Sequence, residues 1–454
     1  MKVTLVFDIG KTNKKCFLFD KNYQKVYQEY IKIPEIKDED GDPCDDLNAI
    51  EEWIKKILKK LLKNKNRKII AINFSTYGAS FVHLDKYGKP LTPLYNYLKP
   101  YPKKCLASFY KKYGNPLKIA SETASPASEM LNSGFQLYWL KHTQASIFKK
   151  IRWSLHLPQY LSYILTSNFG SDFTSIGCHT SLWHFEKGDY HNWVYAEGLD
   201  KILPPIVKTN HTSIKKISKQ KIKIGVGVHD SSAALLPYLN TIKKPFLLIS
   251  TGTWSISLNP FSKELLTEED LANDCLNYMR INGKSVKATR LFLGNEHQLQ
   301  VEQLAAFFNV KVDAHKKVSF KENIYLQQKD NYQRYFVLIS INNSLPRPAA
   351  SSIKKFTNFE EAYHQLMLEL VELQANMARR AIGNTKIKEI YIDGGFAENE
   401  IFIQLLVRHF KDFKIRTTQS PLGSALGAAM LIADKKIKKN FLKKQYKMKK
   451  WLDG

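Results

Sequence analysis

The feature that most constrains this chain is one pattern that occurs twice: an apolar strand, a polar turn that contains glycine, and a second strand. It is read in "VFDIGKTNKKCFLFD" (residues 6–20) and again in "FLLISTGTWSISLNP" (residues 246–260). Each segment is typical of a β-hairpin, and each is followed by alternating helical and strand-like runs. Two halves that begin alike predict a duplicated α/β architecture with a cleft between the halves.

The first turn contains Gly-Lys-Thr, the ending of the P-loop phosphate motif. A P-loop needs another glycine five positions before the Gly-Lys pair, and its loop leads directly into a helix. Leu5 occupies that position, and a strand follows the turn at 16–19. The P-loop is therefore excluded, although a phosphate could still lie against the N–H groups of the hairpin turn.

Several further elements can be placed from spacing. Apolar residues recur at helical intervals over 47–62 behind an Asp N-cap, and the run at 68–79 resembles a buried strand whose polar end is a strand tip. Strand tips of α/β sheets are where ligands collect. Later segments predict a helix from Ser231 with Asp230 at its start, a helix over about 359–382, strands at "EIYIDGG" and "KIRTT", and helices after Glu398 and over about 421–433.

Length and composition set broad limits. The 454 residues exceed one typical core, so two domains of about 200 residues each are expected. The five cysteines are scattered without the paired spacing of zinc or redox motifs, which favours a reduced cytoplasmic setting. The sequence contains no uncharged apolar run of roughly 18 residues, so we expect a soluble intracellular protein. The cysteines are Cys16, Cys44, Cys105, Cys178 and Cys275.

The formal net charge is +27, and its lysines are spread along the chain. One concentrated block, "KKIKKNFLKKQYKMKK", covers residues 435–450. We interpret this block as a solvated basic tail rather than a specific nucleic-acid site, because no known nucleic-acid module is visible. A general benefit for anionic substrates is compatible with either interpretation.

Five segments in a fixed order carry a family resemblance: "FDIGKTNKK", "STYGASFVHLD", "GVGVHDSSAA", "STGTWS" and "IYIDGGFAEN". Together they resemble the FGGY family of carbohydrate kinases, and "TYG", "VHD" and "GTWS" are most similar to the rhamnulokinases and fuculokinases. The resemblance implies two ribonuclease-H-like domains of the actin and hexokinase ATPase type. It implies a sugar-binding domain at 1–237 and a nucleotide-binding domain at 238–434, before the basic tail at 435–454.

The resemblance also implies roles for the nucleotide side of the cleft, with ATP and Mg²⁺ as cofactors. Asp8 resembles an aspartate that holds Mg²⁺ through its water shell, and a turn-capping carboxylate is the alternative. Gly394 and Gly395 would contact adenosine, with Phe396 and Asn399 nearby, although a plain strand-to-helix turn would look the same. The residues that would clamp the phosphates are Gly10, Lys11, Thr12, Asn13, Lys14, Lys15, Gly252 and Thr253.

On the acceptor side, Asp230 matches the family's catalytic base, which takes the proton of the attacking sugar hydroxyl. An N-cap role for Asp230 is compatible with that function. By the same resemblance, the residues that line the sugar pocket would be Thr76, Tyr77, Gly78 and His229.

The implied function is an ATP-dependent ketose kinase, with a deoxyketose such as L-rhamnulose or L-fuculose as acceptor. Alternatives are a kinase for xylulose, glycerol or another small polyol, and a non-catalytic actin-like nucleotide-binding protein. The expected partner is the small sugar, with no membrane or nucleic acid, and the family permits a monomer or a homodimer. Some positions depart from the pattern of deoxyketose kinases and predict a changed pocket: Ser80, Leu98, Lys99 and Leu291, with unmatched polarity at Arg290, Glu296 and His297.

Overall fold

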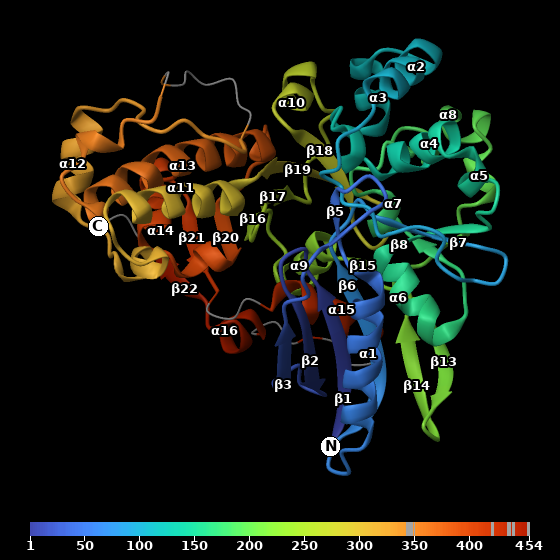
Figure 1. Ribbon diagram of the computed structural model, residues 1–454. Coiled ribbons are helices and arrows are strands. Elements are labelled where there is room, and N and C mark those ends of the chain that lie inside the picture. The colour runs from blue at the N-terminus through green and yellow to red at the C-terminus, as the bar shows by residue number, and fades with distance from the viewer. Residues whose placement is uncertain (342–347, 349, 419–421, 434–436, 438–440, 452–454) are drawn as a thin grey trace.

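The computed structural model describes residues 1–341, 348, 350–418, 422–433, 437 and 441–451, and it contains two large β-sheets (Figure 1). The first sheet is built from β1 (Lys2–Ile9), β2 (Lys14–Asp20), β3 (Lys25–Ile31), β6 (Lys68–Thr76), β13 (Thr212–Ile217), β14 (Gln220–Gly225) and β15 (Val228–His229). The second sheet contains β16 (Leu247–Thr251), β17 (Ser255–Asn259), β18 (Cys275–Met279), β19 (Ser285–Leu291), β20 (Glu389–Gly394), β21 (Lys414–Thr417) and β22 (Lys449–Trp451).

The two sheets share one topology. β1 pairs with β2 antiparallel and with β6 parallel, just as β16 pairs with β17 antiparallel and with β20 parallel. The order β3-β2-β1-β6-β14 in the first sheet therefore corresponds to β19-β17-β16-β20-β21 in the second. The duplicated α/β architecture that the repeated hairpin pattern predicts is confirmed.

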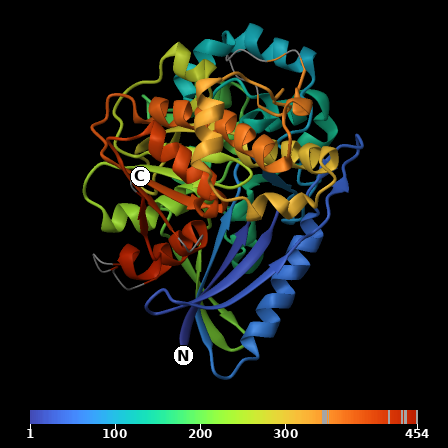
Figure 2. The same ribbon diagram turned by 90° about the vertical axis from the view of Figure 1, so that its left-hand side faces the viewer.

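Long helices cover the outer face of each sheet. α1 (Leu47–Leu62) and α6 (Leu157–Thr166) pack on the first sheet through an apolar cluster that includes Leu5 and Phe7 of β1. The side chain of Asp46 accepts a hydrogen bond from the N–H of Ala49 and caps α1, as the sequence predicts. Helices α11 (Leu293–Phe307), α13 (Phe359–Ile382) and α14 (Glu400–His409) cover the second sheet and lie toward the viewer in Figure 2.

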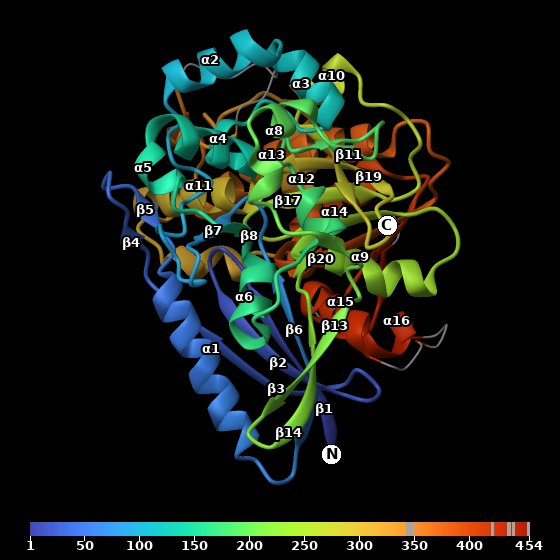
Figure 3. The ribbon, with the colours of Figure 1, turned by 90° about the vertical axis from the view of Figure 1, so that its right-hand side faces the viewer.

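Two short helices, α9 (Asp230–Thr241) and α15 (Gly423–Ile432), fill the space between the sheets. Their alanines share one buried cluster with Val6 of the first sheet and Leu248 of the second. The helices approach so closely that a Cβ on Gly427 would lie 1.9 Å from the carbonyl oxygen of Ala233. α15 lies beside β6 of the first sheet (Figure 3). The Nδ2 of Asn73 on β6 donates to the carbonyl of Ala428 (2.8 Å), which fixes α15 to that sheet.

A mostly helical segment between β6 and β13 forms the upper right of Figure 1. An aromatic cluster around Phe109 and Trp193 makes its core. The segment contains β7 (Phe81–Leu84), α2 (Lys103–Tyr113), α3 (Pro116–Thr123), α4 (Ser133–Thr143), α5 (Ala145–Phe148), β8 (Trp153–His156), β9 (Ser171–Asp172), α7 (Phe173–Ile176), α8 (Asn192–Ala196) and β12 (Ile206–Val207).

The described part of the basic tail is packed rather than free in solvent. α16 (Phe441–Gln445) buries Phe441 and Leu442 in the cluster between the sheets, and β22 pairs antiparallel with β21. The apolar residues between the lysines therefore hold the described part of this segment against the fold. Residues 435–436, 438–440 and 452–454 of the predicted tail, and Pro421 at the predicted start of α15, lie outside the described residues.

Two expectations from composition concern the cysteines and the membrane. All five cysteines are buried free thiols, in line with their unpaired spacing. Among the described residues, no helix combines the length and the apolar character required to span a bilayer.

The close approach of α9 and α15 generates a prediction. Gly427→Ala should lower the free energy of unfolding by about 2 kcal/mol, because overpacking a tight contact typically costs about 1–3 kcal/mol. Urea unfolding measures the change. Gly395→Ala is the control, since a Cβ at Gly395 meets no atom within 4 Å. Equal stability of the two variants would contradict the packing described here.

Candidate active site

A cleft of about 580 Å³ lies between the two hairpin turns. It collects residues from both halves of the chain, at the ends of β1, β6, β16 and β20 and at the start of α9. Of the residues singled out in the sequence, those that line it are Asp8, Gly10, Lys11, Thr12, Asn13, Lys15, Tyr77, Gly78, His229, Asp230, Gly252, Thr253, Gly394 and Gly395.

The two turns face each other directly. In the first turn, the N–H of Gly10 donates to the carbonyl of Asn13 (3.0 Å), and in the second, the N–H of Gly252 donates to the carbonyl of Trp254 (2.8 Å). The hydroxyl oxygens of Thr12 and Thr253 are 3.1 Å apart. Hydroxyl and backbone groups from both halves can therefore reach one ligand.

Four residues that the resemblance places at the ligands, namely Lys14, Thr76, Phe396 and Asn399, do not line the cleft. Lys14 is buried, and its ammonium contacts Asp45 Oδ1 (2.7 Å) and the carbonyl of Lys11 (2.9 Å). Thr76 donates its hydroxyl to the carbonyl of Tyr77. Asn399 caps α14 and donates its Nδ2 to the hydroxyl of Tyr363.

The lysines of the first turn divide between structure and ligand binding. Lys11 is paired with Asp45 (2.7 Å) and Glu35 (2.8 Å), although it borders the cleft. Burial would raise the pKa of Asp45, but Lys11 and Lys14 outweigh burial and lower it. Lys15 borders the cleft and is in no ion pair within the described part of the chain. Lys15 is therefore the ammonium of this turn that can meet an added anion.

Three aspartates meet at the cleft, and burial raises the pKa of each to about 6. Asp8, at the end of β1, accepts a hydrogen bond from the hydroxyl of Ser424 (3.0 Å). Asp230 begins α9 and accepts a hydrogen bond from the N–H of Ser231. Asp393, near the end of β20, accepts a hydrogen bond from the hydroxyl of Tyr238 (3.3 Å). We did not single out Asp393, although an acid at the tip of a buried strand, next to Gly394, was a visible signal.

His229 lies beside the carboxylate of Asp230. Its Nε2 lies 3.2 Å from Asp230 Oδ1 and 3.1 Å from Cys178 Sγ. Burial lowers the pKa of His229 to about 4, so the imidazole is neutral near pH 7. A neutral ring at this distance lies beside the carboxylate of Asp230 without neutralising it.

The glycine pair after β20 leaves one wall of the cleft without side chains. Gly394 has φ 90°, and a Cβ there would lie 1.7 Å from the carbonyl oxygen of Thr251, so no other residue fits. A Cβ at Gly395 would project into open space. A flat ring could lie against this backbone.

Of the residues that depart from the family pattern, Arg290 borders the cleft. The other departing residues do not line the cleft, so they do not alter its wall directly. Ser80 and Leu291 are buried outside the cleft lining, and Leu98 is exposed. Glu296 accepts hydrogen bonds from the N–H groups of residues 339 and 340, and His297 contacts Tyr363. Cleft residues that sequence reasoning missed include Tyr97, Leu131, His179, Trp254, Tyr278, Asp393, Glu398 and Ser424.

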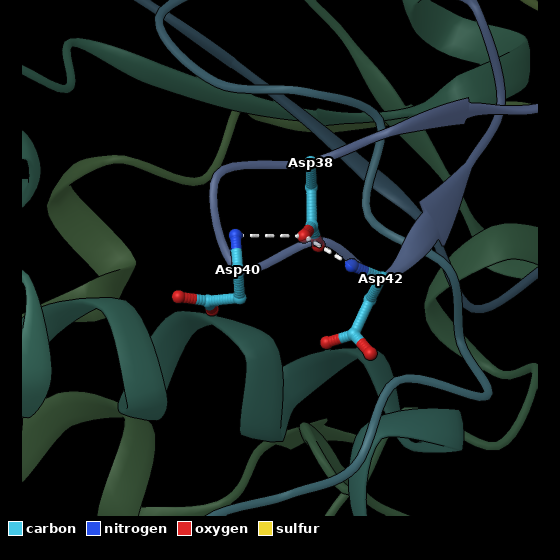
Figure 4. A group of neighbouring side chains, drawn as sticks. All are labelled: Asp38, Asp40 and Asp42. Atoms are coloured by element: carbon cyan, nitrogen blue, oxygen red, sulfur yellow. Dashed lines mark hydrogen bonds between the residues drawn. The ribbon is translucent and has the colours of Figure 1, made fainter.

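An acidic cluster is formed by Asp38, Asp40 and Asp42 (Figure 4). The side chain of Lys99 contacts all three. The N–H groups of Asp40 and Asp42 both donate to Asp38 Oδ1, each at 3.0 Å. Three carboxylates this close could hold a metal ion, but the ammonium of Lys99 contacts Asp38 (2.7 Å), Asp40 (2.9 Å) and Asp42 (2.7 Å). Lys99 thereby ties the 38–42 loop to the segment that carries the cleft residue Tyr97.

Comparison with known proteins agrees with this geometry. Residues 3–236 match the model of the N-terminal domain of the FGGY family of carbohydrate kinases. Residues 243–440 match the model of the family's C-terminal domain. The two matches define a class of two-domain sugar kinases. The chain belongs to the FGGY family.

Curated relatives include a rhamnulokinase of Halalkalibacterium halodurans, 24% identical over 265 residues, and one of Yersinia pestis, 26% identical over 262 residues. The first alignment covers 56% of this chain and 56% of the relative, and the second covers 56% and 53%. The chain thus spans a little over half the length of the curated relatives it matches.

Solved structures share the fold. A carbohydrate kinase from Novosphingobium aromaticivorans has a TM-score of 0.74 at 23% identity, covering 94% of this chain and 90% of that one. A ligand-bound xylulose kinase from Lactobacillus acidophilus has a TM-score of 0.77 at 18% identity, covering 95% and 89%. The predicted pair of actin and hexokinase-type domains is confirmed.

The acidic cluster generates a second prediction. Lys99→Met should lower the free energy of unfolding by about 3 kcal/mol, because removing one partner of a buried ion pair leaves uncompensated charge. Urea unfolding measures this. Lys55→Met is the matched control, since Lys55 is exposed and its pair with Glu51 lies on a helix surface. If Lys99→Met unfolds at the wild-type urea concentration, the cluster does not stabilise the fold.

Proposed function

We propose that this protein is an ATP-dependent carbohydrate kinase that transfers the γ-phosphate of ATP to a hydroxyl of a ketose. One observation carries the proposal: the carboxylate of Asp230 borders the same cleft as two opposed glycine turns from different halves of the chain. Phosphoryl transfer requires a base near the attacking hydroxyl and donors around the phosphates. The cleft supplies both.

The nucleotide side of the cleft fits a triphosphate. The polar turn backbones, the hydroxyls of Thr12 and Thr253, and the ammonium of Lys15 are donors that suit phosphate oxygens. Asp8 would hold Mg²⁺, with Asp393 as a second carboxylate, because oxygen ligands are those that Mg²⁺ prefers. Mg²⁺ bound with the nucleotide supplies neutralisation of the phosphate charge. Gly394 and Gly395 leave room for the adenosine, with Asn399 behind them on α14.

On the acceptor side, Asp230 accepts the proton of the substrate hydroxyl while the oxygen of that hydroxyl bonds to the γ-phosphorus. The bond between that phosphorus and the bridging oxygen of ADP breaks, and ADP leaves. The N–H and the hydroxyl of Ser231 donate to the carboxylate of Asp230, and the Nε2 of His229 lies 3.2 Å from it. A positioned base of this kind typically contributes about 10²–10⁴-fold to the rate. In this proposal residues 1–237 bind the sugar, residues 238–434 bind ATP, and closure of the cleft excludes water.

The relatives named rhamnulokinase support a deoxyketose acceptor such as L-rhamnulose or L-fuculose. Xylulose or glycerol is the alternative acceptor, because xylulose and glycerol kinases share the fold. The sugar is the expected partner of a cytoplasmic monomer or homodimer.

ATP consumption with a panel of ketoses and polyols tests the proposal. We expect turnover with at least one ketose, and a loss of about 10²–10⁴-fold in kcat for Asp230→Asn. Asp46→Asn is the matched control, because Asp46 caps α1 and is not among the cleft residues. Absence of turnover with every sugar would favour a non-catalytic nucleotide-binding protein. Undiminished turnover by Asp230→Asn would contradict the assignment of Asp230 as the catalytic base.

The raised pKa of Asp230 predicts the pH dependence. The base acts only when ionised, and burial raises its pKa to about 6. Below that pH the protonated fraction grows, so kcat/KM should fall by about fivefold between pH 6 and pH 5 and should level off above pH 7. Initial rates between pH 5 and 8 measure this, with circular dichroism to show that the fold persists. A level profile down to pH 5 would contradict the assignment.

A further inference from the structure

The carboxylate of Asp393 is held by two hydrogen bonds at the border of the cleft. Its Oδ1 accepts from the N–H of Gly394 (2.7 Å), and its Oδ2 accepts from the hydroxyl of Tyr238 (3.3 Å). Because an ionised carboxylate oxygen has two lone pairs, each oxygen keeps one for a further ligand. Asp393 can therefore contribute to a cation site without losing either hydrogen bond.

Tyr238 belongs to α9, the helix that begins with Asp230, and it is fully buried. Burial, and then the charge of Asp393, raise the pKa of its hydroxyl well above the usual value. The hydroxyl is therefore protonated and can donate to Asp393. One helix thus carries the proposed base at its first residue and, about two turns later, the side chain that holds a second carboxylate of the cleft.

The C-terminal tail packs against Tyr238 from the side away from the cleft lining. The ring of Tyr446, which follows α16, lies 5.7 Å from the ring of Tyr238, and Tyr446 is buried. The hydroxyl of Thr418 donates to the carbonyl of Tyr446 (3.0 Å), and β22 pairs with β21 just beyond. These contacts fasten the tail to the second sheet. Residues 441–451 thus place an aromatic ring beside the residue that holds Asp393.

Tyr446 makes this contact through its ring. Its hydroxyl is buried and has no hydrogen-bond partner among the described residues. The ring of Phe441 lies 6.3 Å from that of Tyr446 and 5.9 Å from that of Tyr23, which belongs to the first half of the chain. The match to the family's C-terminal domain ends at residue 440, so this aromatic support lies beyond the matched residues.

We propose that Tyr238 is a positioning residue that orients Asp393 for the Mg²⁺ of a bound nucleotide, and that the tail segment 441–451 supports Tyr238 through the ring of Tyr446. This inference rests on the proposed kinase function, in which Asp393 is a second carboxylate for Mg²⁺. Tyr238 acts through Asp393 and is not itself in the cleft lining.

Tyr238→Phe tests the inference, because it removes the hydroxyl and keeps the ring. Calorimetry measures the Kd of ADP once with Mg²⁺ and once with EDTA. We expect the Kd of Mg·ADP to rise by about tenfold, because losing the partner that orients a metal-binding carboxylate typically costs about 10–100-fold in affinity. The Kd of ADP in EDTA should stay unchanged, since the hydroxyl acts on the cation site alone.

Tyr391→Phe is the matched control. The ring of Tyr391 lies 5.4 Å from that of Tyr238, but its hydroxyl donates to Glu389 rather than to Asp393. This variant removes a hydroxyl from the same group of aromatic side chains. It should leave both Kd values at those of the wild-type protein.

Two variants of Tyr446 test the contribution of the tail. Tyr446→Ala removes the ring beside Tyr238 and should raise the Kd of Mg·ADP severalfold, again without a change in EDTA. Tyr446→Phe keeps the ring and loses only a hydroxyl without a partner among the described residues, so it should bind Mg·ADP as the wild-type protein does. Wild-type binding by Tyr446→Ala would refute the role of the tail.

An unchanged Kd of Mg·ADP in Tyr238→Phe would overturn the inference. An equal rise with Mg²⁺ and with EDTA would also overturn it, since it would indicate a general loss of structure. ADP binding requires no sugar, so these outcomes do not depend on phosphoryl transfer. If the variants behave as expected but the wild-type protein phosphorylates no sugar, the kinase function is refuted and the role of Tyr238 stands.

Discussion

The packing of α9 and α15 between the two sheets is the constraint on which the cleft depends. α15 contains two glycines and three alanines, and α9 presents the small side chain of Ala233, so their backbones meet at Gly427 and Ala233 and the sheets can come near each other. The first residue of α9 is Asp230. The start of α15 contacts Asp8 through Ser424, and a Cβ on Gly423 would lie 2.7 Å from Asp393 Oδ2. One packing arrangement therefore brings three carboxylates from distant parts of the chain to one place.

The balance of charge inside the cleft is opposite to that of the whole chain. The formal charge is +27, yet two lysines of the first turn, Lys11 and Lys14, pair with Asp45, and burial, together with the charge of Asp230, raises the pKa of Asp8. Burial is the main cause of the raised pKa values of Asp8, Asp230 and Asp393. The many surface lysines are too screened by solvent to offset it. Local geometry, not net charge, sets the chemistry available at the site.

Local patterns made much of this fold predictable. Helical spacing and the Asp46 cap locate α1, the apolar run locates β6, and the glycine turns locate both hairpins, because each depends on neighbours in sequence. The partners of Lys14 and Lys99 could not be predicted, since Asp45 is 31 residues from Lys14 and Asp38 is 61 from Lys99. The clamp and pocket roles assigned from resemblance stay predictions, and Lys14, Thr76 and Asn399 lie behind the cleft wall. The apolar residues of the basic tail pack part of it against the fold. They are visible in the sequence, but the many lysines favour the interpretation as a solvated segment.

The contact between the hydroxyls of Thr12 and Thr253 has a consequence for how a nucleotide arrives. The hydroxyls belong to turns of opposite sheets and lie within hydrogen-bonding distance, so in the described conformation the two halves touch between the turns that we propose to clamp the phosphates. A single neutral hydrogen bond of this kind contributes only about 1 kcal/mol. Separating these two hydroxyls therefore costs little, so this contact alone would not keep the phosphate donor of the proposed kinase out of the cleft.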